Sequence, residues 1–289
     1  MSIIECLGPR PACRPRRPLP PGAWDTHFHV LGPQAKYPYS PTRKYTPPDA
    51  PLDRALAFHD SLGVARGLVV HANTHGFDNA VDLDAVARAG GRYFAVVRLD
   101  GKATPEDCRR LHEQGARGVR FAFNPQHGGT LDQRAFEHVL GCIDGLGWFV
   151  ELHFEGAAIP GLRNWLEAIP VNVVIDHAGR IDVSMGLDQE PFGILCDLMQ
   201  RPNFWTKVSG AERLTKRGPP YEDVAPFFRK LAAIAPERLI WGSDWPHTGV
   251  FEERSMPDDA DLADFLYRCF DETIVERILV DNADRLLNT

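Results

Sequence analysis

The sequence has no long apolar segment, no excess of positive charge and no closely spaced pair of cysteines. None of its apolar runs approaches the roughly 18 residues that a transmembrane helix needs, so we expect no membrane partner. Acidic residues outnumber basic ones by 39 to 32, and the formal charge is −7. This balance gives no electrostatic reason to expect a nucleic-acid partner.

The six cysteines are widely scattered, and no C-x-x-C motif occurs. They are Cys6, Cys13, Cys108, Cys142, Cys196 and Cys269. This spacing argues against a zinc–thiolate site and against a disulfide framework. We therefore expect reduced, mostly structural thiols in a cytoplasmic protein.

The first 22 residues are rich in proline and arginine. They contain six prolines together with Arg10, Arg14, Arg16 and Arg17. Proline at this density blocks helices and central strands, and the segment lacks the apolar stretch of a secretory signal. We expect a loosely ordered N-terminal arm over residues 1–22, followed by a single domain over residues 23–289.

The rest of the chain alternates short apolar runs with amphipathic stretches of helical period. The runs are mostly continuous and rich in Val, Ile and Phe, as in strands buried on both faces of a parallel sheet. Eight such runs occur: Trp24–Leu31, Arg66–Ala72, Tyr93–Leu99, Gly118–Phe123, Trp148–Phe154, Val171–Asp176, Phe204–Val208 and Leu239–Gly242. This alternation predicts an α/β fold, the (β/α)8 TIM barrel. The alternative, a doubly wound open sheet, would need a glycine-rich phosphate loop where His27-Phe28-His29 stands.

Histidines gather at the carboxyl ends of the expected strands, where a barrel of this type carries its functional groups. His27 and His29 are two residues apart on one strand, so both side chains point to the same face. Three further histidines and an aspartate end other strands: His71, His153, His177 and Asp244. Such convergence is hard to explain as packing, because buried polar groups need partners. We predict that His59, on an expected helix, lies at the surface.

Several longer phrases resemble the amidohydrolase superfamily. They are WDTHFHVLGP, YPYSPTRKYTPPDAPL, VIDHAGR, WTKVSGAERL and IWGSDWPHT, and the resemblance runs from about residue 22 to the C-terminus. The set is similar to the amidohydrolase-2 branch, which contains 2-pyrone-4,6-dicarboxylate lactonase and related lactonases. The resemblance implies a barrel enzyme that hydrolyses a lactone ester.

The resemblance also implies roles for particular residues. Asp244 matches the family's general base, which activates water. The residues around the lactone carbonyl in that family match His27, His29 and His177. Substrate contacts fall on eight further positions: Tyr45, His71, Asn73, Arg120, Asn124, Gln126, His153 and Arg213. Ester hydrolysis needs an activated water, a stabilised oxyanion and a positioned substrate, and these residue types can supply all three. Arg120 can hold a substrate carboxylate, or it can instead form an ion pair with Glu151.

Two positions depart from the pattern of the 2-pyrone-4,6-dicarboxylate enzyme. Gln126 stands where that enzyme has a second arginine, which weakens the case for a second substrate carboxylate. His153 replaces a tyrosine and favours a site for one divalent ion, zinc or manganese, with four ligands: His27, His29, His153 and Asp244. The same histidines could instead donate hydrogen bonds without a metal, and the sequence leaves both arrangements open.

The expected function is hydrolysis of a small carboxylated lactone, either 2-pyrone-4,6-dicarboxylate-like or a sugar-acid lactone. Two alternatives remain: a metal-dependent decarboxylase of the same superfamily, and a non-catalytic protein that binds sugar acids. Release of carbon dioxide would identify a decarboxylase. Saturable binding without turnover would identify a binding protein. The sequence does not indicate an oligomeric state.

Overall fold

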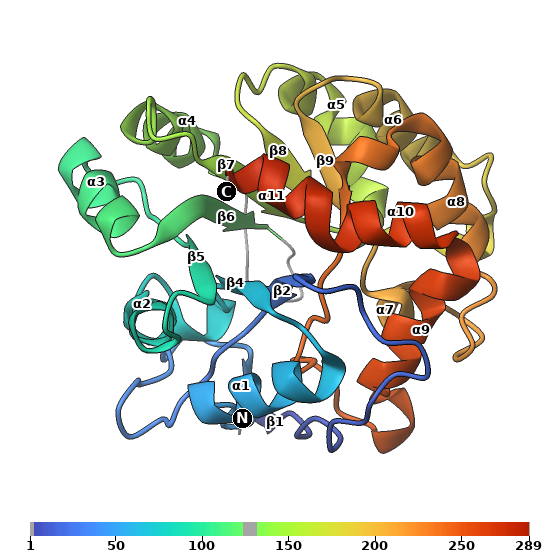
Figure 1. Cartoon of the computed structure of the whole chain (residues 1–289). Coiled ribbons are helices and arrows are strands. Elements are labelled where there is room, and N and C mark those ends of the chain that lie inside the picture. The colour runs from blue at the N-terminus through green and yellow to red at the C-terminus, as the bar shows by residue number, and fades with distance from the viewer. Residues whose placement is uncertain (1–2, 124–131, 289) are drawn as a thin grey trace.

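A sheet of eight parallel strands forms the centre of the molecule, in a computed structural model that describes residues 3–123 and 132–288. The strands are β2 (Trp24–Phe28), β4 (Arg66–Val70), β5 (Tyr93–Val97), β6 (Ala116–Ala122), β7 (Phe149–His153), β8 (Val173–Ile175), β9 (Phe204–Lys207) and β10 (Leu239–Ile240). Neighbours in the sheet follow the order of the chain, from β2 to β10. All eight predicted strands are confirmed, and the sheet curls into a (β/α)8 barrel (Figure 1).

Backbone hydrogen bonds close the barrel between β2 and the segment that follows β10. The amide of Thr26 donates to the carbonyl of Trp241 over 2.9 Å, and the amide of Asp244 donates to the carbonyl of His27 over 2.7 Å. A Cβ atom at Gly242 would lie 2.4 Å from the Cβ atom of His27. The first and last strands can therefore meet only because this position has no side chain.

Helices connect successive strands and cover the outside of the barrel (Figure 1). They are α1 (Leu52–Leu62), α2 (Ala80–Arg88), α3 (Pro105–Glu113), α4 (Gln133–Cys142), α5 (Ile159–Glu167), α6 (Glu190–Met199), the short α7 (Ala211–Leu214) and α8 (Ala225–Ile234), with α9 (Asp259–Cys269), α10 (Glu272–Glu276) and α11 (Asn282–Leu287) after β10. Local signals set their ends: Thr104 and Asp107 form a capping box before α3, and Gly63 ends α1 with a φ of 84°. Within the described ranges, every helix is too short or too polar to cross a membrane.

Apolar side chains fill the part of the barrel interior that lies against α11. Leu68 and Val70 of β4 belong to a buried cluster that also contains Trp24 and, from α11, Leu286. Trp24 begins β2, and its indole N–H donates to Asp284 of α11 over 2.8 Å. Because α11 covers the amino ends of the strands, a site must lie at the carboxyl ends.

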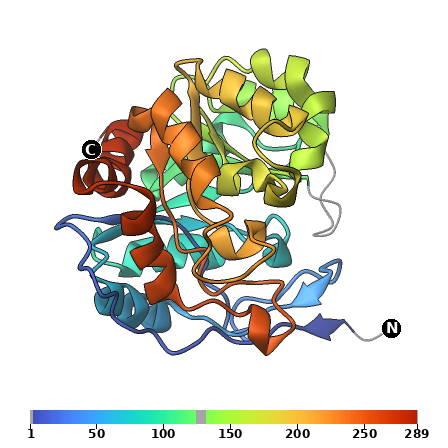
Figure 2. The ribbon, with the colours of Figure 1, turned by 90° about the vertical axis from the view of Figure 1, so that its right-hand side faces the viewer.

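The N-terminal arm is anchored to the barrel, which differs from the expectation of a loosely ordered segment. β1 (Ile4–Glu5) pairs in parallel with β3 (Tyr45–Thr46), and Figure 2 shows the two short strands side by side. The backbone amides of Arg16 and Arg17 each donate to the carboxylate of Asp264 over 3.1 Å. Composition could not reveal these partners, because they are far away in the sequence.

Candidate active site

The carboxyl ends of the strands surround a small inner pocket of about 30 Å³. Its lining contains eight residues that the sequence predicts for the site: His29, Tyr45, Asn73, Arg120, His153, His177, Arg213 and Asp244. Sequence reasoning missed Arg180 and Thr248, which also line the pocket. Arg180 stands inside the quoted phrase VIDHAGR, so its place in the segment Asp176–Arg180, which follows a strand, was the available signal.

Asp244 is the centre of the pocket, and three imidazoles face its carboxylate. Oδ1 lies 3.6 Å from His27 Nε2 and 3.4 Å from His29 Nε2. Oδ2 lies 3.9 Å from His177 Nε2. The structure therefore brings together the four residues that the resemblance assigned to catalysis.

A guanidinium holds the other side of this carboxylate. Arg213 Nε donates to Asp244 Oδ2, and Arg213 Nη2 donates to the carbonyl of Thr248 over 3.2 Å. Burial alone would raise the pKa of Asp244, but the charge of Arg213 and the contacts with His177 and His29 hold it well below its ordinary value. Asp244 is therefore ionised at neutral pH.

Three of the pocket histidines, His27, His153 and His177, are neutral in this environment. Burial lowers the pKa of His177 to about 3. Burial, followed by the charge of Lys207 for His27 and of Arg120 for His153, lowers the pKa of both well below the ordinary value. His29 Nδ1 donates to the carbonyl of Val70 over 2.7 Å, and its Nε2 lies 3.4 Å from Asp244 Oδ1.

The backbone of the site is strained. His177, Ala178 and Asp244 adopt positive φ angles of 49°, 47° and 61°, which L residues rarely do. Such conformations cost about 1–3 kcal/mol each and persist only where the surroundings fix them. A Cβ atom at Gly210 would lie 3.0 Å from the His177 side chain, so glycine there leaves space for the imidazole.

A buried charge cluster supports the pocket from below. Lys207 is completely buried, and its ammonium group donates to Glu151. Its Nζ also lies 2.8 Å from His27 Nδ1 and 2.9 Å from Asp176 Oδ1. Burial opposes ionisation of Asp176, but Lys207, His27 and Arg120 hold the pKa of Asp176 well below its ordinary value. Lys207 thus fixes the orientation of His27. Sequence reasoning did not single it out.

Arg120 takes part in the same cluster. Its Nη2 lies 3.0 Å from Asp176 Oδ2, and its Nε lies 3.2 Å from Glu151 Oε1. The ion pair with Glu151 that the sequence offered as an alternative is therefore present. Its Nη1 donates to the carbonyl of His71 over 3.1 Å.

One other predicted substrate contact, His71, lies away from the inner pocket. The ring nitrogens of His71 lie 2.7 Å from Asp82 Oδ2 and 3.0 Å from the carbonyl oxygen of Gly76. His71 is fully buried, so the structure places it in the wall behind the pocket. Asn124 and Gln126 fall outside the described residues.

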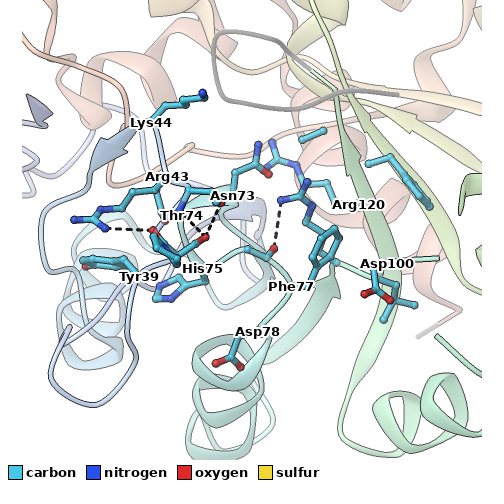
Figure 3. Close-up of a pocket in the computed structure, with 18 of the residues that line it drawn as sticks. Tyr39, Arg43, Lys44, Asn73, Thr74, His75, Phe77, Asp78, Asp100 and Arg120 are labelled. Atoms are coloured by element: carbon cyan, nitrogen blue, oxygen red, sulfur yellow. Dashed lines mark hydrogen bonds between the residues drawn. The ribbon is translucent and has the colours of Figure 1, made fainter. Parts of the chain in front are cut away.

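A much larger outer cavity of about 920 Å³ adjoins the inner pocket. The two share Tyr45, Asn73 and Arg120 in their linings. Figure 3 shows Arg43 on one side of the outer cavity, with Arg120 and Phe77 on the other. A small substrate can therefore extend from Asp244 past Arg120 into this cavity.

The donor atoms around Asp244 fit a single divalent cation. His27, His177 and Asp244 each offer one ligand atom, and these atoms lie within 4.8 Å of one another. His27 Nε2 is buried and has no hydrogen-bond partner, and the Nδ1 of His29 donates to a carbonyl, as in many metal-bound histidines. This group contains two of the four ligands predicted from the sequence, His27 and Asp244, together with His177, and it includes neither His29 nor His153.

This arrangement defines the protein as a barrel enzyme whose chemistry rests on an aspartate and histidines at the strand ends. The chain belongs to the amidohydrolase family, which matches residues 24–289. It is 47% identical over 285 residues to the 4-sulfomuconolactone hydrolase of Hydrogenophaga intermedia, covering 98% of this chain and 94% of the relative. It is 38% identical over 283 residues to the 2-pyrone-4,6-dicarboxylate hydrolase of Comamonas testosteroni, covering 94% of this chain and 92% of the relative. An apo crystal structure from Agrobacterium tumefaciens superposes with a TM-score of 0.85 at 32% identity, covering 95% and 98% of the two chains.

Proposed function

We propose that this protein hydrolyses the ring ester of a small anionic lactone. The observation that carries the proposal is the ionised carboxylate of Asp244, which faces the imidazoles of His27, His29 and His177 at the end of a pocket. Two relatives are named as hydrolases of 4-sulfomuconolactone and 2-pyrone-4,6-dicarboxylate, which are lactones with acidic substituents. Both names support the same reaction class.

Asp244 acts as the general base in this proposal. Its carboxylate takes a proton from water while the water oxygen attacks the lactone carbonyl carbon. N–H groups of His27 and His177 stabilise the oxyanion that develops. The ring C–O bond then breaks, and Asp244 returns the proton to the leaving oxygen, so the product is the open hydroxy acid or its tautomer.

The other pocket residues position the substrate. Tyr45, Asn73 and His153 provide polar groups around the lactone ring, because all three line the inner pocket. Arg120 and Arg213 contribute positive charge on two sides of the pocket. The substrate contacts predicted for His71, Asn124 and Gln126 remain predictions from the sequence.

The site also fits a divalent metal. His27, His29, His177 and Asp244 are the residues that would hold it. A bound zinc or manganese ion would supply Lewis-acid chemistry and lower the pKa of water. Asp244 carries out the proton transfers described above whether or not a metal is bound.

The test is hydrolysis of 4-sulfomuconolactone and 2-pyrone-4,6-dicarboxylate, followed by ultraviolet absorbance and by product analysis. Asp244→Asn should lower kcat by about 10²- to 10⁴-fold, as expected for loss of a general base. Asp78→Asn, which alters a carboxylate of the outer cavity, should leave kcat near that of the wild type. Full activity of Asp244→Asn would refute the proposal. Comparing chelated enzyme with zinc- or manganese-loaded enzyme determines the metal requirement.

A further inference from the structure

The two arginines of the inner pocket are already paired with carboxylates of the protein. Arg120 contacts Asp176 and Glu151 at 3.0 and 3.2 Å. Arg213 donates to Asp244 and lies 3.4 Å from Glu212. Much of their charge is therefore neutralised before a substrate arrives, which raises the question of which cation recognises a second acidic group.

Arg98 is a cation of the outer cavity that forms no ion pair with any carboxylate of the described residues. It follows β5 directly, lines the cavity and is half-buried. Its Nη1 donates to the carbonyl of Gly76 over 3.3 Å, and its guanidinium lies over the Phe77 ring, 4.5 Å from the centroid. Among the described residues, no carboxylate lies within ion-pair distance of it. Two neutral contacts therefore hold the guanidinium in place while its charge stays unpaired.

Arg98 lies close to the catalytic end of the cavity. Burial, and then the charge of Arg120, lowers the pKa of Arg98 to about 10. The carbonyl of Gly76, which accepts from Arg98, also lies 3.0 Å from Nε2 of His71. The backbone carbonyl of His71 in turn accepts from Arg120. A short run of contacts thus connects Arg98 to the wall of the inner pocket.

The acidic residues in the described lining of the outer cavity, Asp78, Asp100 and Asp132, each accept hydrogen bonds from backbone amides, Asp132 from those of Arg134 and Ala135. Asp78 accepts from the amide of Ala80 over 3.0 Å, and Asp100 accepts from the amide of Lys102 over 2.9 Å. Figure 3 shows both carboxylates at the periphery, away from Arg43. The guanidinium of Arg43 donates to Thr46 Oγ1 and to the carbonyl of Ser40 and lies over the Tyr39 ring, and no ion pair joins it to a carboxylate of the described residues, so it adds to the positive potential of the cavity.

We infer that Arg98 binds a second anionic group of the lactone, a sulfonate or a carboxylate, while the ester carbonyl lies at Asp244. A guanidinium fixed on one edge can offer its other edge to two oxygen atoms of such a group. Arg98 thereby selects dianionic over monoanionic lactones. The inference rests on the proposed function and names the substrate class of the same site.

A binding experiment tests this subsite without requiring turnover. Isothermal titration calorimetry compares 3-sulfobenzoate, which carries two acidic groups, with benzoate, which carries one. The wild type should bind 3-sulfobenzoate more tightly, and Arg98→Met should weaken that binding roughly 10- to 100-fold while leaving benzoate unchanged, as expected for a charged hydrogen bond. Arg98→Lys should retain part of the preference.

Arg117→Met is the matched control. Arg117 also lies over an aromatic ring, 4.8 Å from the centroid of Phe94, and donates to the backbone carbonyls of His112 and Ala116. It does not line the outer cavity, so its loss should leave both affinities unchanged. Thermal melting checks that each variant is folded.

Either of two results would overturn the inference: equal affinity of the wild type for the two anions, or a parallel loss of both in Arg98→Met. The kinetic counterpart compares 4-sulfomuconolactone with muconolactone, which lacks the sulfonate. Arg98→Met should raise KM only for the sulfonated lactone. If the wild type hydrolyses neither lactone yet Arg98 controls 3-sulfobenzoate binding, the proposed reaction fails while the anion subsite stands.

Discussion

At the scale of single residues, the charge of Asp244 controls how activity should depend on pH. Arg213 favours the ionised carboxylate, so the pKa of Asp244 lies well below its ordinary value, and burial keeps His177 neutral down to about pH 3. The kcat/KM of the wild type should therefore stay constant as the pH is lowered from neutrality to about 5.

Arg213→Gln tests the cause of this behaviour. Without the guanidinium, the pKa of Asp244 should rise, because the adjacent positive charge that favours the ionised carboxylate is gone. An acidic decline in kcat/KM should then move upward into the measurable range. Arg117→Gln should keep the wild-type profile, since Arg117 lies outside the pocket. An unshifted profile in Arg213→Gln would contradict the assignment of Asp244 as the titrating base.

Sequence reasoning located the residues at strand ends but not those inside the barrel. His27, His29 and Asp244 follow from the strand assignment, because carboxyl ends of parallel strands converge. Lys207 was missed, although a lysine within an apolar run signals a buried charge that needs carboxylate partners. The prediction that His59 lies at the surface was wrong: it is fully buried, with Nε2 3.1 Å from Asp25 Oδ2. Helical periodicity cannot show that a polar residue faces such a partner.

At the scale of elements, Asp25 joins three segments at the seam of the barrel. Its carboxylate accepts from the backbone amides of His27 and Ser243, both over 3.0 Å, and from the hydroxyl of Ser243 over 2.5 Å. His59 brings α1 to the same carboxylate. One buried side chain thus holds β2, the segment after β10 and the first helix together.

Asp25→Ala should lower the free energy of unfolding by about 3–5 kcal/mol, because it leaves several buried donors without an acceptor. Urea denaturation measures the loss. Asp107→Ala removes an exposed carboxylate that accepts from the amide of Thr104 at the start of α3, and it should cost only about 1 kcal/mol. Equal losses in the two variants would show that the seam does not depend on Asp25.

At the scale of the whole molecule, the alternation of apolar and amphipathic segments predicted the barrel, because each strand and helix carries its own pattern. The path of the N-terminal arm could not be predicted in that way. Its partners are long-range: the amide of Cys6 donates to the carbonyl of Thr46 over 2.8 Å, and the amide of Leu7 donates to the carbonyl of Val250 over 3.0 Å. The arm thereby joins two loops that flank the inner pocket.

Removal of residues 1–8 should therefore affect substrate binding more than folding. Tyr45 of β3 donates to Thr248 over 3.1 Å, and both residues line the inner pocket. Without β1, the two loops lose backbone hydrogen bonds worth about 1 kcal/mol each, so KM should rise at least roughly fivefold. The melting temperature should change little, because the arm adds few residues to the barrel core. Steady-state kinetics and thermal melting measure the two effects, and an unchanged KM would show that Tyr45 and Thr248 are held in place without the arm.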